Sequence, residues 1–352
     1  MKIALPKIRR ILKAMSGRRI GVVGDLMLDR YVWGTATRLS PEAAVPVVEF
    51  VGEDAFPGGA GNVAANLAAL GARVLVFGVV GEDDAGKSLR ERLRAYGVPA
   101  KGIVCTPGRQ TTVKTRIIAR YQQVVRIDRE MRAPLDEAAQ EHLIRRIIAR
   151  LRHLDALVIS DYDKGVVTDA LAERVLSSCH RLRVPVFVKP KTSRLFVYRG
   201  AAAIVCNRGE AGFFLTRTLD DDTAIEDAGR ALLAHFGCSA VVITLREKGM
   251  CIVEDSGTGV MEIPATSFEV TYKRVGQPGV DRGATGRQVF DVTGAGDSVI
   301  ATLALARAAG ASLRDAAWLA NTAAGVVVGK LGTTTVSREE LLAAVRDLAR
   351  KN

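Results

Sequence analysis

Short apolar runs alternate with longer amphipathic stretches along most of this chain, and this alternation limits the folds open to it. The apolar runs predict strands near residues 19–25, 73–80, 156–160, 185–188, 203–206, 240–244, 250–254 and 287–292. The stretches between them predict helices near residues 63–70, 84–96, 134–152, 168–181, 223–235, 298–310, 312–329 and 337–350. Continuously apolar strands separated by helices build a parallel sheet with helices on both faces. We therefore expect an α/β protein, a three-layer α/β/α sandwich with a mostly parallel sheet, in which residues 1–352 form a single domain.

Two stretches depart from this alternation. Residues 30–55 and 103–128 alternate polar and apolar residues, with no helix between the strands that they predict. We expect these strands to form a small second sheet, a β lid over the ligand-binding edge of the main sheet. Because exposed strand edges tend to pair with another chain, we also expect a homodimer joined through the lid strands.

The net charge of +12 is compatible with several classes of partner. Nucleic acid is one of them. However, Lys and Arg are spread along the chain and aromatic residues make up only 5% of it, so the sequence offers no evident platform for stacking bases. Small anions such as a nucleotide or a sugar phosphate explain the charge at least as well. A basic surface without a specific role is the plain alternative.

The sequence lacks the marks of a membrane or secreted protein. No apolar run is long enough to span a membrane. Within residues 1–19, Ile8, Ile11, Leu12 and Met15 have helical spacing, which predicts a short amphipathic helix and not a signal peptide. Five scattered cysteines without a CxxC pair indicate reduced thiols. We expect a cytoplasmic protein with no membrane and no nucleic-acid partner.

A glycine-rich turn joins the predicted strand 287–292 to the predicted helix 298–310. Gly294 and Gly296 allow a sharp bend and leave no side chains in the way of a ligand. The first amides of the following helix have no acceptor inside the helix, and the helix dipole favours negative charge there. The sequence therefore predicts that a phosphoryl group binds to these amides with Asp297 beside it. The alternative is that Asp297 only caps the helix.

Residues 81–88 (GEDDAGKS) satisfy the phosphate-binding pattern GxxxxGK[ST] between a predicted strand and a predicted helix. Their composition argues against that role. Glu82, Asp83 and Asp84 would place three carboxylates in a loop that must hold phosphates, and like charges repel. We favour a strand-to-helix turn shaped by Gly81 and Gly86.

Two motifs together point to a family. Gly58, Gly59 and Asn62 early in the chain, and the sequence DVTGAGD at 291–297, resemble the ribokinase-like (phosphofructokinase-B) carbohydrate kinases. The resemblance extends from about residue 20 to residue 335. In that family GxDxxG is an ordinary structural turn, which residues 81–86 match. Within this family, five segments resemble the branch that phosphorylates heptose 7-phosphates, and they are residues 24–34, 38–48, 112–128, 160–165 and 325–337.

This resemblance implies an ATP- and Mg²⁺-dependent kinase. Its expected substrate is D-glycero-β-D-manno-heptose 7-phosphate, phosphorylated at the anomeric hydroxyl to give the 1,7-bisphosphate, a precursor of ADP-heptose for lipopolysaccharide core. The four histidines form no HxGH motif, so we expect no nucleotidyltransferase domain. Another ribokinase-like sugar or nucleoside kinase, or a non-catalytic sugar-phosphate-binding protein, are the alternatives.

The late motif carries the catalytic residues that the resemblance implies. Asp297 matches the base that takes the proton of the attacking sugar hydroxyl. The anion-binding amides would come from Gly294, Ala295 and Gly296. In some members of the family the residues matched by Asp291 and Thr293 flank a monovalent cation such as K⁺. Ordinary strand-end and turn roles fit these two residues equally well.

The sugar-binding set that the resemblance implies lies early in the chain. Its residues supply donors and acceptors for hydroxyl groups, and they are Asp25, Asp29, Gly58, Gly59 and Asn62. An N-cap role is the alternative for Asn62. On the predicted lid, Lys114, Arg116 and Arg126 are candidates for the substrate's own phosphate. A solvated strand face is the alternative for these three.

The nucleotide-binding set that the resemblance implies is Asn207, Glu210, Thr244, Gly249 and Asn321. Glu210 would organise Mg²⁺, through water. The chain departs from the family at residues 189–191, where Lys-Pro-Lys replaces the usual Asp-Pro-Lys. This lysine reverses a charge near the phosphates, and both weaker metal binding and stronger phosphate binding are open. Asp161 and Lys164 follow a predicted strand, where ligands gather in α/β sheets, and are given no specific role.

Overall fold

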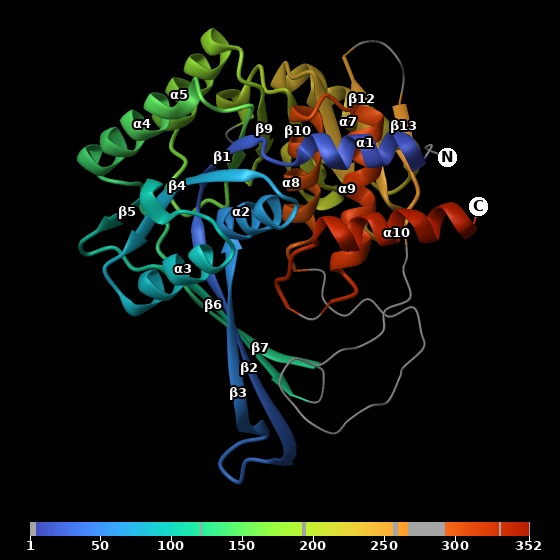
Figure 1. Cartoon of the computed structure of the whole chain (residues 1–352). Coiled ribbons are helices and arrows are strands. Elements are labelled where there is room, and N and C mark those ends of the chain that lie inside the picture. Colours follow the sequence, from blue (N-terminus) through green and yellow to red (C-terminus); the bar gives the residue numbers. More distant parts are fainter. Residues whose placement is uncertain are drawn as a thin grey trace.

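The computed structural model describes residues 5–119, 122–191, 195–255, 260–266, 293–330 and 332–351 (Figure 1). Within these ranges the main sheet has nine strands in the order β13-β12-β11-β10-β9-β8-β1-β4-β5. Neighbouring strands from β11 to β5 pair in parallel, whereas β12 and β13 are antiparallel. The bounds are β1 (Arg19–Gly24), β4 (Arg73–Gly81), β5 (Ile103–Thr106), β8 (Ala156–Ser160), β9 (Val186–Lys189), β10 (Ala203–Asn207), β11 (Ala240–Thr244), β12 (Met250–Glu254) and β13 (Val260–Ile263). The predicted mostly parallel sheet is confirmed.

Helices cover both faces of this sheet and bury two separate apolar cores. Alternate residues of one strand face opposite cores, so Val158 of β8 packs into the first and Ile159 into the second. The first core is covered by α1 (Leu5–Met15), α2 (Ala60–Ala69), α3 (Asp84–Ala95), α8 (Ala295–Ala308), α9 (Leu313–Val327) and α10 (Arg338–Lys351). The second is covered by α4 (Glu137–Leu151), α5 (Asp169–Leu182), α6 (Arg208–Phe214) and α7 (Asp222–Phe236). The three-layer α/β/α arrangement is therefore confirmed.

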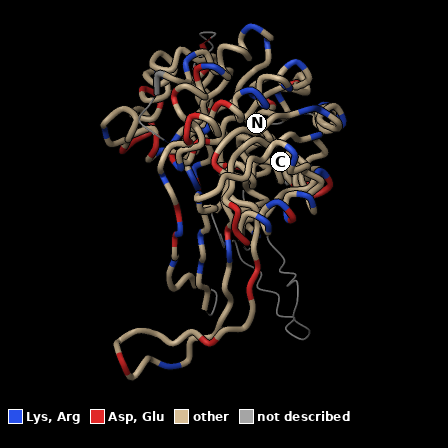
Figure 2. The backbone as a smooth tube through the Cα atoms, turned by 90° about the vertical axis from the view of Figure 1, so that its left-hand side faces the viewer, with Lys and Arg blue, Asp and Glu red and all other residues tan. Residues whose placement is uncertain are grey.

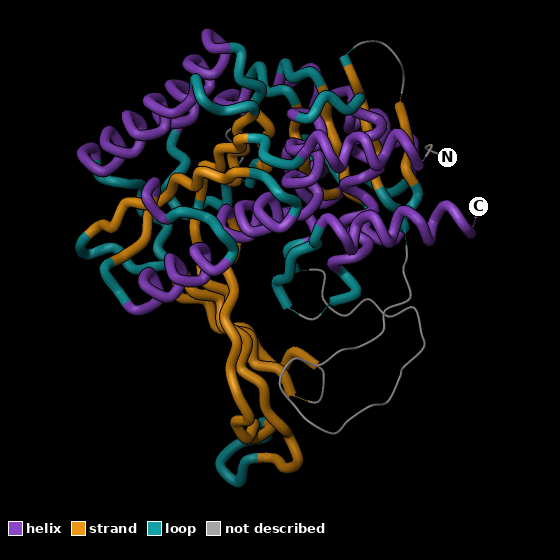
Figure 3. Tube along the Cα trace, viewed as in Figure 1, coloured by secondary structure: helices purple, strands orange, loops and turns teal. Residues whose placement is uncertain are grey.

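A second sheet of four strands projects from the main body (Figure 3). Its order is β3 (Pro46–Gly59), β2 (Leu26–Leu39), β6 (Thr112–Ala119) and β7 (Gln122–Arg129). The small sheet that the sequence predicts is confirmed, with one correction. Residues 103–106, inside the predicted lid range, form β5 and pair with β4 at the edge of the main sheet, because Ile103 is buried in the first core.

Other predictions concern the termini and the loops. The amphipathic N-terminal helix is confirmed as α1, which buries Ile8, Ile11, Leu12 and Met15. The predicted strand 287–292, and Asp291 within it, lie outside the described residues. In the described part of the chain, no helix combines the length and apolar character that crossing a membrane requires. Lys and Arg are distributed over the whole body and do not form a single stripe (Figure 2).

The stretch that matches the phosphate-binding pattern is a structural turn. Asp83 caps α3: its carboxylate accepts hydrogen bonds from the backbone N–H of Gly86, at 2.8 Å, and of Thr111, at 2.9 Å. These contacts occupy an amide that a phosphate would need. Lys87 is exposed and pairs with Asp84 at 3.4 Å. A Cβ atom on Gly81 would lie 2.1 Å from the backbone oxygen of Arg109, which explains the glycine.

Candidate active site

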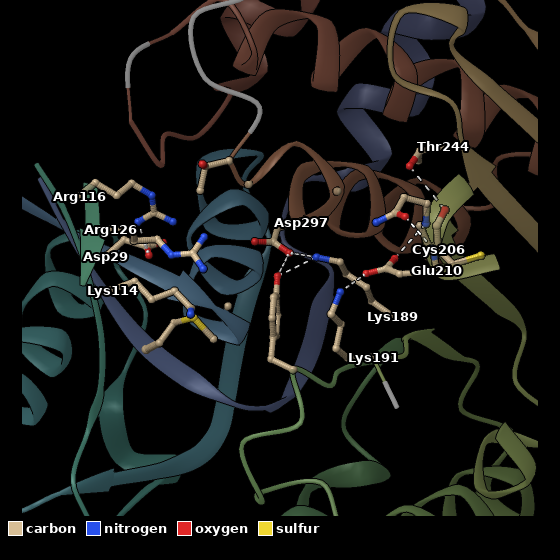
Figure 4. A pocket seen from close by; sticks show the side chains of 18 residues that line it. Asp29, Lys114, Arg116, Arg126, Lys189, Lys191, Cys206, Glu210, Thr244 and Asp297 are labelled. Atoms are coloured by element: carbon tan, nitrogen blue, oxygen red, sulfur yellow. Dashed lines mark hydrogen bonds and ion pairs between the residues drawn. The ribbon is translucent and has the colours of Figure 1, made fainter. Parts of the chain in front are cut away.

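A cavity of about 470 Å³ lies where the carboxyl ends of the parallel strands meet the second sheet and the first turn of α8 (Figure 4). In an open α/β sheet this edge is the usual place for a ligand. The second sheet supplies one wall, the ends of β9, β10 and β11 supply the opposite wall, and α8 lies between them. The lining residues named in the sequence analysis are Asp29, Gly59, Lys114, Arg116, Arg126, Lys189, Lys191, Asn207, Glu210, Thr244, Thr293, Gly294, Gly296 and Asp297.

Asp297 is buried at the centre of this cavity. Its Oδ2 accepts a hydrogen bond from Asn62 Nδ2 at 3.0 Å, and its Oδ1 accepts from Lys189 Nζ at 2.7 Å and from the Tyr162 hydroxyl. The N-cap of α8 is Gly294, so the carboxylate of Asp297 is directed into the cavity and not back onto its own helix. The interpretation of Asp297 as only a helix cap is wrong.

Gly294 owes its identity to the close approach of α2. Its φ of 83° lies in the left-handed region, and a Cβ atom there would come within 2.6 Å of Asn62 Nδ2. Asn62 is itself inside α2, whose N-cap is Gly59, so the predicted alternative of an N-cap role for Asn62 is wrong. Instead, Asn66 Nδ2 donates to Asn62 Oδ1 at 3.0 Å, and Ser298 Oγ donates to Asn66 Oδ1 at 2.9 Å. This buried chain of hydrogen bonds orients the amide that holds Asp297.

Asp25 organises the loop that follows β8. Its carboxylate accepts hydrogen bonds from the backbone N–H of Tyr162, Lys164 and Val166, at 2.7, 3.3 and 3.1 Å. Burial, and to a smaller extent the nearby charge of Asp161, raise the pKa of Asp25 to about 6. Asp25, predicted to bind the sugar, therefore supports the loop after β8 in this structure and does not line the cavity.

That loop carries Tyr162, which the sequence analysis missed. Burial and the charge of Asp297 raise its pKa, so Tyr162 stays protonated and donates to Asp297. The available signal was its position directly after Asp161, at the end of an apolar strand. Asp161 itself accepts hydrogen bonds from the Tyr198 hydroxyl and the backbone N–H of Asp163, which gives this residue a structural role.

Asp29 anchors the wall formed by the second sheet. Its Oδ1 accepts from Arg116 at 2.7 Å and its Oδ2 from Thr333 Oγ1 at 3.0 Å. Burial raises the pKa of Asp29, although Arg116 opposes this shift. Thr333 also lies 3.1 Å from the Tyr31 hydroxyl, so the network joins the second sheet to the segment after α9. No sequence pattern indicates that Thr333 belongs to this network.

The other cations on this wall have carboxylate partners. Lys114 Nζ lies 2.9 Å from Asp128 and 3.4 Å from Glu130, and Arg126 also pairs with Asp128. Burial opposes ionisation of Glu130, but hydrogen bonds from Lys164 and Arg132 lower its pKa to about 2. The side chains of Lys114 and Arg116 are largely buried. The alternative of a solvated strand face therefore describes only Arg126, which is half exposed.

The opposite wall is built around the first turn of α6. Asn207 and Glu210 form a capping box: Asn207 Oδ1 accepts from the N–H of Glu210 at 2.8 Å, and Glu210 Oε2 accepts from the N–H of Asn207 at 2.9 Å. The other oxygen of Glu210 accepts from Lys191 Nζ at 2.8 Å. This wall presents a carboxylate and an ammonium group side by side.

Several predicted site residues do not line the cavity. Gly58 belongs to the β2–β3 ladder, where a Cβ atom would lie 2.5 Å from Asp29 Oδ2. Gly249 forms the turn between β11 and β12 with a φ of 96°. Asn321 donates to the backbone oxygen of Pro264 at 2.8 Å. Ala295 is the first residue of α8, so only its backbone is placed for an anion.

Comparison with known families shows to which family the chain belongs. The model of the family described as "pfkB family carbohydrate kinase" matches residues 18–340. The chain belongs to the pfkB family of carbohydrate kinases. The predicted ribokinase-like membership is therefore confirmed, and the protein is a carbohydrate kinase.

Curated relatives place this kinase more closely. It is 43% identical over 324 residues to the "Bifunctional protein HldE" of Citrifermentans bemidjiense. The aligned region covers 92% of this chain and 62% of that protein. It is 40% identical over 338 residues to the HldE protein of Paramagnetospirillum magneticum, covering 96% and 65%. The chain thus spans somewhat less than two thirds of the length of these relatives.

Solved structures show the same fold at low sequence identity. A putative ribokinase from Agrobacterium tumefaciens superposes with a TM-score of 0.73 at 20% identity, covering 96% of this chain and all of that one. The Arabidopsis thaliana ribokinase complexed with ribose and ATP gives a TM-score of 0.71 at 18% identity, covering 94% and 99%. These similarities confirm the ribokinase-like fold of the kinase.

The chemistry of the cavity suits phosphoryl transfer. Among the described residues, Asp297 Oδ2 has one hydrogen-bond partner, so a lone pair remains for an acceptor hydroxyl. The first amides of α8 provide donors for an anion beside it. Glu210 fits Mg²⁺, which commonly takes one or two carboxylates together with phosphate oxygens and water. In the described ranges, no group of three or more His, Cys, Asp or Glu residues could hold a metal ion.

Proposed function

We propose that this kinase transfers the γ-phosphoryl group of ATP to the anomeric hydroxyl of D-glycero-β-D-manno-heptose 7-phosphate, giving the 1,7-bisphosphate. The resemblance of residues 24–34, 112–128 and 160–165 to heptose 7-phosphate kinases supports this substrate, as does the identity with the HldE proteins. The observation that carries the proposal is the cationic wall of Lys114, Arg116 and Arg126. Across Asp297 it faces the opposite wall, formed by the ends of β9, β10 and β11 and called the nucleotide wall below.

That wall fits a sugar that already carries a phosphate. A neutral sugar needs hydrogen-bonding groups but no cluster of cations. Lys114 and Arg126 share Asp128 as a partner. A phosphate dianion would compete with this carboxylate for both cations, and a bidentate contact to Arg126 would favour the phosphate. Arg116 is held by Asp29, so it contributes positive charge and a fixed shape.

The transfer step uses groups on both sides of Asp297. The anomeric hydroxyl oxygen attacks the γ-phosphorus of ATP and its proton passes to Asp297, while the bond from phosphorus to the β,γ-bridging oxygen breaks and its electron pair leaves with ADP. The N-terminal amides of α8 stabilise the transferring group. Mg²⁺, when bound near Glu210, would neutralise charge on the phosphates. Thr293 lines the cavity and, with Asp291, is the candidate for a K⁺ site.

We further propose that a second copy of the chain covers the second sheet. Its edge strands β3 and β7 are unpaired within the described chain, and bare edges favour pairing. Large apolar side chains are exposed on this sheet and at its tip, and they are Leu39, Val45, Phe50, Val51, Val124, Val125 and Ile127.

A cytoplasmic location agrees with the need for ATP and with five free cysteines.

A substrate panel tests the proposal. ADP release is measured with heptose 7-phosphate, ribose, fructose 6-phosphate and unphosphorylated heptose, each with and without Mg²⁺. We expect turnover that depends on Mg²⁺ and is highest with heptose 7-phosphate. Release with ribose or fructose 6-phosphate but not with heptose 7-phosphate would identify another sugar kinase. Binding of heptose 7-phosphate without ADP release would identify a non-catalytic binding protein.

A further inference from the structure

Lys189, at the end of β9, joins the nucleotide wall to Asp297. Its Nζ lies 2.7 Å from Asp297 Oδ1 and 2.7 Å from the Tyr162 hydroxyl, and 4.6 Å from the centre of the Tyr162 ring. The Lys189 side chain is 16% exposed and that of Asp297 is 4% exposed. An ion pair so well shielded from water is stronger than a surface pair and is costly to break.

Lys189 also lies against the first turn of α8. A Cβ atom on Gly296 would be 3.4 Å from Lys189 Cε and 3.5 Å from its Nζ. The amides of Ala295 and Gly296 are among the first of the helix, so they have no acceptor inside it. An anion bound to these amides is therefore within reach of the Lys189 ammonium group.

The ammonium group has a donor left for such an anion. A lysine can donate three hydrogen bonds. Among the described residues, Asp297 and Tyr162 take two of them. A cation with one remaining N–H, next to a helix N-terminus, suits a phosphoryl oxygen. The lysine can bind this oxygen without leaving Asp297.

We propose that Lys189 is a catalytic residue that contacts the γ-phosphoryl group during transfer, and that it replaces with a fixed ammonium the aspartate usual at this position in the family. This inference rests on ATP-dependent phosphoryl transfer at Asp297. As the bond to the β,γ-bridging oxygen breaks and the bond to the sugar oxygen forms, Lys189 stabilises the charge on the three oxygens of the transferring group. The same ammonium holds the carboxylate of Asp297 in place through its 2.7 Å contact with Oδ1.

The test compares Lys189→Gln with Lys189→Arg. Glutamine keeps hydrogen bonding but removes the charge, so we expect kcat to fall about 100-fold, as for loss of one donor to a developing charge. The KM for the sugar phosphate should change by less than about threefold, because the interaction belongs to the transition state. Arginine should recover part of kcat. The control is Lys87→Gln, which removes an exposed charge from residues 81–88 and should leave kcat unchanged.

A binding measurement separates catalysis from structural support. Wild type and Lys189→Gln are titrated with ADP alone and with ADP plus aluminium fluoride and Mg²⁺, which mimics the planar transferring group. We expect unchanged affinity for ADP and an affinity for the fluoride complex lowered at least tenfold in the variant. An equal loss for both ligands, or wild-type kcat in Lys189→Gln, would overturn the inference. If wild type released no ADP with any sugar, the proposed function would fail, and the fluoride titration would still decide the role of Lys189.

Discussion

Asn62 of α2 donates a 3.0 Å hydrogen bond to Oδ2 of Asp297 in α8, although 235 residues separate the two in the sequence. Asn66 and Ser298 continue this network and fix the orientation of the Asn62 amide. The proposed base is thus positioned by a helix that belongs to the sugar-binding motif. This hydrogen bond therefore connects the two motifs that resemble the family, the early one with Asn62 and the late one with Asp297.

Gly294→Ala should break this contact. The new Cβ atom would lie 2.6 Å from Asn62 Nδ2. We expect kcat to fall at least tenfold and the free energy of unfolding to fall by about 2–4 kcal/mol, from backbone strain and the disturbed buried hydrogen bond together. Gly310→Ala is the matched control, because its φ is 85° and nothing lies within 4 Å of its Cβ position. Chemical unfolding and kcat are measured for both, and equal effects would contradict this account.

Asp25 should make stability depend on pH. Its pKa is raised from 3.8 to about 6, so between these values the native state binds more protons than the unfolded state, and stability falls as pH rises. When the pH is lowered from 7 to 4.5, the free energy of unfolding of the wild type should increase by about 2 kcal/mol more than that of Asp25→Asn. The difference between the two proteins removes the contributions of other carboxylates. A difference that is constant with pH, or that has the opposite sign, would refute this prediction.

Lys114→Gln should act on the phosphate of the substrate. Removing this ammonium should raise the KM for heptose 7-phosphate about 10- to 150-fold, because a charge-assisted contact of about 1.5–3 kcal/mol is lost. The KM for ATP should change little, since Lys114 lies on the opposite wall. The same variant assayed with unphosphorylated heptose is the control. Equal losses with both sugars would assign Lys114 a structural role with Asp128.

Phe50→Glu should separate the subunits of the proposed dimer. Phe50 is 67% exposed on the second sheet, and a buried charge at an apolar interface is costly. Light scattering should then give a monomer at micromolar concentration, whereas wild type gives a dimer. Phe213→Glu changes a phenylalanine of α6 that is 63% exposed outside this sheet, and it should leave the dimer intact. A monomeric wild type would contradict the proposal.

The sequence predicted elements better than it predicted contacts. Apolar periodicity located seven of the nine strands described in the main sheet, all but β5 and β13, and it located the amphipathic helix α1, because burial of one face decides which residues are apolar. It did not separate β5 from the second sheet, since the four residues of β5 are too few to show which sheet they join. The glycines and Asp297 were found because a turn and an anion require those residue types.

Partners far apart in the sequence were beyond such patterns. Nothing local indicates that Tyr162 and Lys189 converge on Asp297, or that Thr333 holds Asp29. The family resemblance places Asp25 in the sugar-binding set. Instead, Asp25 accepts hydrogen bonds from three backbone N–H groups. The positions of these groups depend on the register between β1 and β8, which the sequence does not specify.

Turnover by Asp297→Asn is the most direct test of the central claim. The substitution keeps the size of the side chain but removes the acceptor of the hydroxyl proton. ADP release with heptose 7-phosphate should fall about 10³-fold, while the affinity for ATP, measured by calorimetry, should stay within about threefold of wild type. Retained turnover in this variant would contradict the account, because the base would then have to be another residue.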